Sequence, residues 1–289
     1  MYSGHPLMNS LCLKRDEAVT CQYLLSRERD DSSDLSKSNG FRLLGQLLVH
    51  AHGVVSTDNY LNKCMLLLPE YSKDTPSPEP GLECSTFVGN SCCKKGVTLP
   101  FMTEYNWQNI TDYLHCPQKV ALEPQCQKQF FEELCFFLCS PDIGPWIELA
   151  THDEPVTDRF KDIPICASVC DQWYNACQDE YTCTDNWYIG FNNTSGMNKC
   201  HEGTQCLKYP EYFPTSKSFC ENIWDKSFKV VPDDEPCMHF SYDATSGNNP
   251  NRAVAEARAK ELSTSSSLRI YISQILIVGL AILVYKVNT

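Results

Sequence analysis

Hydrophobic positions are spread unevenly along this chain of 289 residues. Residues 1–40 are polar and charged, without an apolar period, and we expect them to be disordered. Residues 126–200 are dense in aromatic sequence and hold eight of the 18 cysteines and three of the five tryptophans. A second apolar run covers residues 270–285. The pattern therefore places the folded core in the middle of the chain.

Four segments are predicted to be helical. Three cover about 122–138, 164–178 and 252–262, and the last of these follows the sequence NNPN, which favours a helix start. A shorter helix is predicted at 103–116, capped by Thr103.

Two further segments carry mostly turn signals. In residues 64–93, the stretch PEYSKDTPSPEPG supplies four prolines and a glycine, which argue against regular structure. Residues 183–237 are expected to form turns and short strands. Together these elements predict a single α+β domain with short helices and short strands.

Two pairs of cysteines are spaced four residues apart, Cys135 with Cys139 and Cys166 with Cys170. On a helix, this spacing places both sulfurs on one face. The Cβ atoms are then farther apart than the roughly 3.5–4.5 Å that a disulfide needs. Each of these cysteines is therefore expected to bond to a different segment.

The cysteine content indicates a disulfide scaffold. All 18 cysteines except Cys12 and Cys21 lie between Cys64 and Cys237, which leaves an even 16 for eight cross-links. Zinc sites usually contain Cys-x2-Cys, a spacing that this sequence lacks, and only seven histidines are present. We therefore predict disulfides, no metal and no cofactor.

Disulfides imply an oxidising compartment, so the protein is expected to be secreted or displayed at the cell surface. The sequons at Asn109 and Asn192 agree with this route as glycosylation sites, and a third sequon overlaps at Asn193. A net charge of -12 argues against nucleic acid as a partner.

The sequence predicts three regions. Residues 1–59 form an N-terminal extension, in which 41–56 is read either as a signal-like segment or as a short amphipathic helix. Residues 60–262 form the cysteine-rich domain, and residues 263–289 form a C-terminal anchor signal or membrane segment.

The C-terminal region has two interpretations. As a helix, residues 270–285 would be about 24 Å long against a hydrocarbon core of about 30 Å, so spanning would require snorkelling by Arg269 and Lys286. Alternatively, the small residues from Ser263 to Ser265 and the apolar tail form a signal for a lipid anchor. Both interpretations attach the protein to the plasma membrane.

Several motifs in the same order resemble the folate receptor family. They are CSPDIGPW at 139–146, NWYIGFNNTSGMNKC at 186–200, YFPTSKSFCENIW at 212–224 and SGNNPN at 246–251. The resemblance covers about residues 60–262 and implies the family's fold with eight disulfides. It implies the pairs Cys64 with Cys92, Cys84 with Cys135, Cys93 with Cys139, Cys116 with Cys206, Cys126 with Cys177, Cys166 with Cys237, Cys170 with Cys220, and Cys183 with Cys200.

The resemblance also implies a ligand site in which aromatic rings enclose a pterin and a carboxylate binds its amino-pyrimidine edge. Glu133 occupies the carboxylate position, where folate binders have aspartate. A carboxylate can accept two parallel N–H bonds from such an edge. The alternative is that Glu132 and Glu133 form a solvated helix face, as most paired glutamates do.

Other candidate positions match the family only in part. Arg159 stands at a basic position, and the full set of candidate ligand contacts is Glu133, Arg159, Tyr188, Phe191, Trp224, Ser227 and Tyr105. Tyr188 replaces a histidine, Phe191 and Asn193 replace tryptophans, and Thr103 replaces a tyrosine. The segment THDEPVTD lacks a Trp-Arg pair. Aromatic faces therefore persist, whereas the contacts for an anionic tail are weaker.

Three other tryptophans, Trp146, Trp173 and Trp187, are predicted to lie in the core, since tryptophan beside disulfides commonly packs against them. We find no motif of a catalytic site, so the chain is predicted to be a binding protein and not an enzyme.

Three functions remain open. The first is a surface receptor that captures folate or a related pterin for uptake. The second is a riboflavin-type carrier. The third is a recognition module of the egg–sperm type, which keeps the scaffold, binds a protein partner and has lost the vitamin site.

Overall fold

The computed structural model describes residues 12–15, 18–21, 56–66, 70–97, 115–119, 121–149, 158–192 and 198–287. The chain divides into two units, Met1–His52 and Gly53–Thr289. In the first unit, β1 (Cys12–Arg15) pairs antiparallel with β2 (Ala18–Cys21). The prediction of disorder is wrong for these two strands, because a paired hairpin satisfies its own backbone hydrogen bonds without an apolar period.

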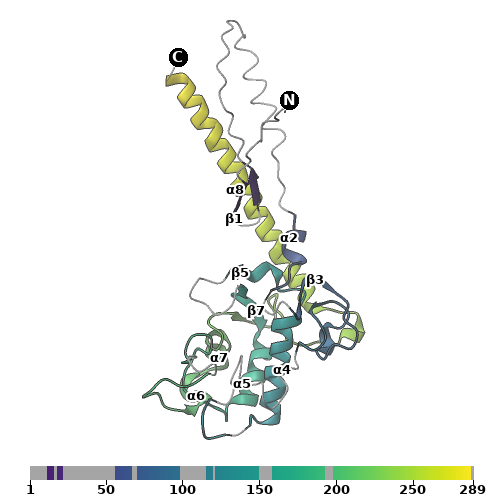
Figure 1. The fold of residues 1–289 in the computed structure, drawn as a ribbon, viewed down its shortest axis with the longest axis vertical. Coiled ribbons are helices and arrows are strands. Elements are labelled where there is room, and N and C mark those ends of the chain that lie inside the picture. Colours follow the sequence, from purple (N-terminus) through teal and green to yellow (C-terminus); the bar gives the residue numbers. More distant parts are fainter. Residues whose placement is uncertain are drawn as a thin grey trace, which may run out of the picture. The chain divides into compact units, whose positions relative to one another are not determined.

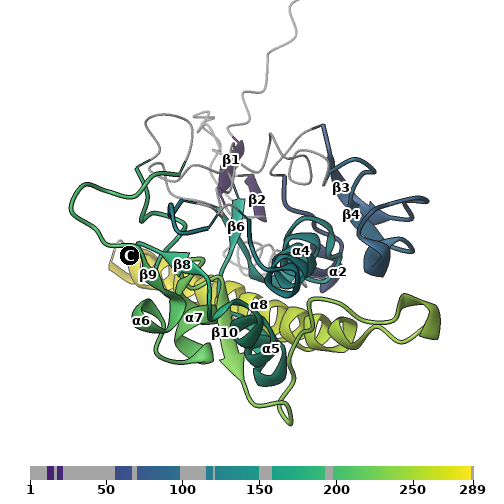
Figure 2. The same ribbon diagram turned by 90° about the horizontal axis from the view of Figure 1, so that it is seen from below.

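Two helices at the centre of the second unit confirm the first two long helix predictions. Helix α4 (Pro124–Cys139) begins with proline in its first turn, where no N–H bond is lost, and α5 (Ala167–Cys177) packs beside it (Figures 1 and 2). Along α4, Cys126, Phe130 and Glu133 are spaced by four and three residues, so they share the buried face. A glutamate thus lies on the apolar face of the helix.

The described part of this unit also contains shorter helices and one long helix. They are α2 (Asp58–Leu61), α6 (Tyr209–Tyr212), α7 (Ser216–Asn222), α8 (Pro250–Val287) and the 3-10 turns η1 (Ser85–Phe87), η2 (Gly144–Trp146) and η3 (Ala244–Ser246). Helices α6 and α7 correct the prediction of turns and strands between 183 and 237. The missed signal is a capping box, in which Thr215 and Ser218 bond reciprocally at the start of α7.

Among the described residues of the second unit, the strands pair into four two-stranded sheets. They are β3 (Ser72–Ser77) with β4 (Ser91–Cys93), β5 (Ile147–Leu149) with β6 (Asp158–Phe160), β7 (Ile163–Cys166) with β10 (Phe228–Val231), and β8 (Tyr181–Thr182) with β9 (Leu207–Lys208). Only β7 and β10 are parallel among these described pairs. Short helices with short strands confirm the α+β class.

Strand β3 contradicts the prediction that residues 64–93 lack regular structure. It includes Pro76 and pairs with β4 only through Ser72 with Cys93 and Ser77 with Ser91, with an irregularity between them. Proline is tolerated in such an edge strand because its missing N–H is not needed there.

Eight disulfides join these elements in the pairing that the resemblance implied. Cys135 and Cys139 on α4 bond to Cys84 and Cys93, respectively, so the two sulfurs on one helix face reach different segments. The Cα–Cα distances run from 4.6 to 6.1 Å, within the usual range.

An aromatic cluster fills the centre of the unit. Phe136 on α4 has its ring centroid 5.4 Å from that of Phe240 and 6.3 Å from that of Phe228, and Trp173 on α5 lies 5.5 Å from Phe240. The three tryptophans predicted to lie in the core are buried, with exposed fractions of 8% for Trp146, 0% for Trp173 and 4% for Trp187.

Helix α8 continues far beyond the predicted end at residue 262. Its first turns pack on the core through Val254, Ala255 and Ala259, which are buried. Farther along, it exposes large apolar side chains, namely Leu268, Tyr271, Ile272, Ile275, Leu276 and Ile277. Within the described residues, no helix is both long and apolar enough to cross a membrane.

Candidate ligand-binding site

Glu133 is a buried acid on the core face of α4, with 4% of its surface exposed. Burial raises the pKa of Glu133 to about 8, and the indole of Trp224 opposes this increase. Among the described residues, no cation pairs with the carboxyl, and the Trp224 Nε1 makes no hydrogen bond of standard geometry. At pH 7 the carboxyl is therefore mostly protonated, so it can donate one hydrogen bond and accept another.

The burial of Glu133 excludes the alternative of a solvated helix face. Its neighbour Glu132 is the solvated member of the pair, half-buried and 3.8 Å from the ammonium group of Lys128 one turn earlier. The two adjacent glutamates thus differ because consecutive residues point to different faces of a helix.

A tight turn before β10 positions Trp224 near Glu133. The Ser227 hydroxyl donates to the Trp224 carbonyl over 2.7 Å, and the Ser227 amide reaches the same oxygen at 3.1 Å. Asp225 and Lys226 between them have φ of 49° and 64°, the left-handed region that such a turn requires. The carbonyl of Ser227 accepts from the Ile163 amide at 3.0 Å, which ties the turn to β7.

Arg159 on β6 is held by Asp225 of this turn. One guanidinium nitrogen donates to the Asp225 carboxylate over 2.9 Å, and the other donates to the Asp225 carbonyl over 2.5 Å. Burial alone would raise the pKa of Asp225, but the hydrogen bonds from Arg159 and Asn186 outweigh it and hold the pKa below its usual value. Asp225 is thus ionised and compensates the charge of Arg159.

Tyr188 lies against the same arginine. The Arg159 guanidinium carbon is 4.6 Å from the centre of the Tyr188 ring, a cation–π contact. Asn186 links the two segments, since its Nδ2 donates to Asp225 over 2.9 Å and its Oδ1 accepts from the Tyr188 amide over 3.0 Å. Gly190 closes this turn because a Cβ there would lie 2.2 Å from the Asn186 carbonyl oxygen.

Trp187 connects this cluster with α4. Its indole stacks nearly parallel on Phe130, at 5.5 Å and 9°, and meets the ring of Trp224 edge-on at 5.8 Å. Its Nε1 donates to the Thr182 hydroxyl over 2.9 Å. The ring centroid of Phe191 lies 6.0 Å from that of Trp187.

The geometry thus collects Glu133, Trp224, Ser227, Arg159 and Tyr188 around one turn and one aromatic stack. A family model described as "Folate receptor family" matches residues 63–239. This match covers more than half of the chain. The chain belongs to the folate receptor family.

Three curated relatives agree with this assignment. Folate receptor gamma from Homo sapiens is 33% identical over 220 residues, covering 72% of this chain and 84% of the relative. Folate receptor alpha from Homo sapiens is 33% identical over 214 residues, covering 70% of this chain and 78% of the relative. Riboflavin-binding protein from Dromaius novaehollandiae is 30% identical over 190 residues, covering 65% and 76%, respectively.

Other positions singled out in this folate receptor family member fall elsewhere. Phe191 is buried, with its ring 4.4 Å from that of His115. Tyr105, Thr103, Asn193 and the sequon at Asn109 lie outside the described residues, whereas Asn192 is exposed. Asp225 and Asn186 were missed by sequence reasoning, although Asn186 begins one of the motifs that resemble the family and Asp225 directly follows the end of another.

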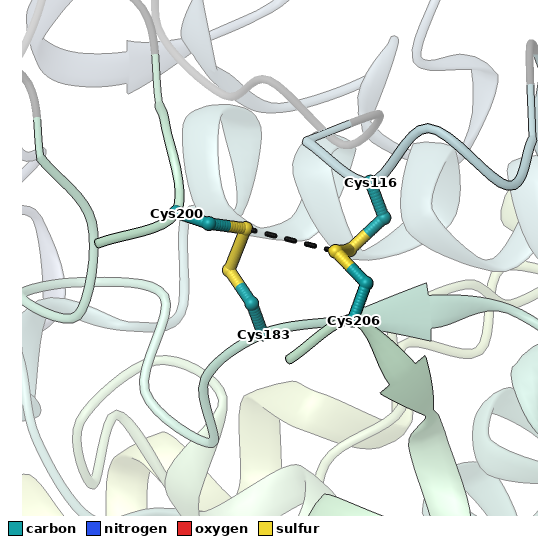
Figure 3. Close-up of side chains that lie close together, drawn as sticks. All are labelled: Cys116, Cys183, Cys200 and Cys206. Carbon is teal, nitrogen blue, oxygen red and sulfur yellow. Dashed lines mark hydrogen bonds between the residues drawn. A yellow bond between two sulfur atoms is a disulfide. The ribbon is translucent and has the colours of Figure 1, made fainter. Parts of the chain in front are cut away.

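Four cysteines, Cys116, Cys183, Cys200 and Cys206, have sulfurs that all lie within 4.8 Å of one another (Figure 3). Such a group resembles a zinc site. In the folate receptor fold of this chain, however, Cys116 bonds to Cys206 and Cys183 bonds to Cys200. Metal ligation needs thiolates, so the cluster acts as a double cross-link in this state.

Proposed function

We propose that this chain is a cell-surface binding protein that captures folate, a related pterin or another flat vitamin and mediates its uptake. The observation that carries the proposal is the carboxyl of Glu133, which is buried beside Trp224 and has no cation to pair with among the described residues. Burying a carboxyl away from water costs free energy that hydrogen bonds must offset, and the interaction with Trp224 offsets only part of it. A ligand edge with hydrogen-bonding groups would recover this cost.

The neighbouring groups suit a flat ring. Trp224 begins the turn that carries Asp225, and the ring of Tyr188 lies against Arg159, which Asp225 holds, so both offer aromatic rings beside this pair. Glu133, Arg159, Tyr188, Phe191, Trp224, Ser227 and Tyr105 remain the proposed contacts. We assign the protein no catalytic step, cofactor or metal.

The same proposal places the protein outside the cell. The eight disulfides support an oxidising compartment, and the exposed Asn192 remains a proposed glycosylation site. We propose that residues 263–289 form the signal for a lipid anchor. The anchor would attach at the small residues from Ser263 to Ser265, and the apolar tail that follows would be removed. Release from cells by a phosphatidylinositol-specific phospholipase would support the anchor, and retention would contradict it.

Two alternatives have support of their own. A riboflavin-type carrier is favoured by the similarity to riboflavin-binding protein and by the weak provision for an anionic tail. A recognition module is favoured by the burial of Phe191, one of the candidate ligand contacts. Its ring packs against His115 and Trp187 and is only 6% exposed, so it offers a ligand little surface.

Calorimetry on the full disulfide-bonded protein tests the proposal with folate, 6-methylpterin and riboflavin. We expect at least one to bind, and Glu133→Met to weaken its binding roughly ten- to a hundredfold, since methionine keeps the size but removes the hydrogen bonds. Glu132→Met, on the solvated side of the same helix, is the matched control and should bind as the parent does. Absence of binding by all three at micromolar concentrations would contradict the proposal and favour the recognition module.

A further inference from the structure

Arg159 is the candidate contact for an anionic ligand group, and its charge is already compensated. Its side chain is 11% exposed and makes two hydrogen bonds to Asp225, one to the carboxylate and one to the main-chain carbonyl. Asn186 donates to the other carboxylate oxygen over 2.9 Å and so fixes the acid in place. To reach Arg159, the carboxylate of a ligand would have to displace Asp225 or lie beside it. Two neighbouring carboxylates repel each other because both are negatively charged.

The other charged groups near this turn do not provide a binding site for an anion in place of Arg159. Lys161 and Lys226 are exposed on adjoining turns, where solvent and salt screen them, and Lys226 donates to Asn222 over 2.6 Å. Glu133 is mostly protonated and carries little charge. Ile189, next to Tyr188, is 65% exposed and presents an apolar surface instead.

We infer that the site takes an uncharged planar heterocycle with a hydrogen-bonding edge, and that Asp225 sets this preference by excluding ligands with an anionic tail from Arg159. The inference rests on the proposed function and narrows its ligand class. The ring of the ligand is held by hydrogen bonds from its edge to Glu133 and by the aromatic side chains. The glutamate tail of folate, in contrast, adds no binding free energy. Discrimination of this kind comes from a repulsive group as much as from attractive ones.

The test compares ligands that share a ring but differ in the tail. Folate and 6-methylpterin share the pterin ring, and only folate carries the glutamate tail; riboflavin and lumiflavin make an uncharged pair on the flavin ring. Dissociation constants are measured by calorimetry on the full disulfide-bonded protein. We expect the parent to bind 6-methylpterin at least as tightly as folate. If lumiflavin binds and 6-methylpterin does not, the ligand is still an uncharged planar heterocycle, but a flavin instead of a pterin.

Asp225→Asn tests the role of the acid. Asparagine tolerates the positive φ of this position and can still accept from Asn186, so the turn should keep its shape. It removes the negative charge and leaves Arg159 uncompensated. The preference for folate over 6-methylpterin should then rise by about tenfold, a change typical of one charge contact in a partly buried site.

Asp162→Asn is the matched control, because Asp162 is an exposed acid with φ of 56° whose amide donates to the Lys226 carbonyl on the same turn. It should leave the ratio of the two constants unchanged. If the parent binds folate more than tenfold tighter than 6-methylpterin, the inference is wrong while the proposed function stands. An unchanged ratio in a folded Asp225→Asn protein also overturns it. Should that variant not fold, the ligand preference of the parent alone decides the point.

Discussion

Two buried acids near the same helix, Glu133 and Asp142, have opposite surroundings. Glu133 is 4% exposed on α4, and Asp142 is 1% exposed just after the helix ends. Burial raises the pKa of both carboxyls. Only Asp142 has strong opposing contacts, since Asn249 donates to it over 2.7 Å and Arg252 over 3.5 Å.

The contacts of Asp142 join two motifs that are distant in the sequence, CSPDIGPW at 139–146 and SGNNPN at 246–251. Asn249 also accepts from the Asn251 amide over 3.0 Å, and Asn251 in turn accepts from the His239 amide over 2.8 Å and donates to its carbonyl over 2.9 Å. The start of α8 is thereby fastened to the segment that follows α4. Gly144 in the same segment allows close packing, because a Cβ there would lie 2.0 Å from the Tyr60 carbonyl oxygen.

The two acids have different roles: Asp142 is buried as part of the fold, whereas we propose that Glu133 is buried as part of the ligand site. Asp142 is satisfied by the protein itself, so its removal should affect folding. Glu133 has only the opposing indole of Trp224 among the described residues, so its removal should affect binding more than folding. Each of the following predictions tests one side of this contrast.

The largest expected effect is on stability, from Asp142→Asn. The amide would turn an N–H group towards the donors of Asn249 and Arg252 and leave the guanidinium without its buried partner. Because Arg252 is 37% exposed, water offsets part of the loss, and we expect a decrease of about 2–3 kcal/mol in the free energy of unfolding. Urea unfolding with the disulfides intact measures it.

The matched substitution, Glu133→Gln, should not lower the free energy of unfolding of the ligand-free protein at pH 7. In the folded protein it replaces one mostly neutral group by another, and in the unfolded chain it removes an ionised carboxylate whose desolvation opposes folding. If both amides destabilise the protein equally, the contrast between the two acids is wrong.

The next effect concerns pH. Glu133 titrates near 4.5 in the unfolded chain and at about 8 in the folded protein, so between these values the folded state holds a proton that the unfolded state has lost. Stability should therefore fall as pH rises from about 5 to 8, by at most about 1.4 kcal/mol per pH unit. Asp142 adds to the fall, because its pKa is also raised.

Unfolding curves at several pH values check this prediction with the parent and Glu133→Gln. The part of the decrease that comes from Glu133 should be absent in the variant. An identical dependence in both proteins would show that Glu133 is ionised at neutral pH.

Much of the fold could be predicted, for reasons that particular residues illustrate. The spacing of Cys135 and Cys139 within an apolar segment predicted both α4 and the need for separate partners. The identity of those partners came only from the family resemblance, because spacing leaves many pairings open. Strand β3 was missed because proline signals are local, whereas an edge strand depends on the neighbour with which it pairs.

The candidate site was predictable as a list of residues but not as a chemical environment. Glu133 was found by its position in the motif order, yet its protonation depends on burial by α4 and on the absence of a cation among its described neighbours. Asp225 and Arg159 are 66 positions apart in the chain, and their pairing follows from how β6 meets the turn before β10. Such contacts between distant segments leave no local signal in the sequence.

The smallest expected effect comes from Arg252→Gln. The side chain of Arg252 is 37% exposed, lies 3.5 Å from Asp142, and also donates to Glu256 over 2.9 Å on the surface of α8. Partly exposed pairs of this kind contribute little, so we expect a loss of about 0.5–1 kcal/mol in the free energy of unfolding. Glutamine can still donate to Asp142, which limits the loss further. Urea unfolding measures the change, with Arg258→Gln as the control because Arg258 pairs only with exposed Glu261 among its described contacts. A loss as large as that of Asp142→Asn would mean that the arginine, and not Asn249, is the main partner of the buried acid.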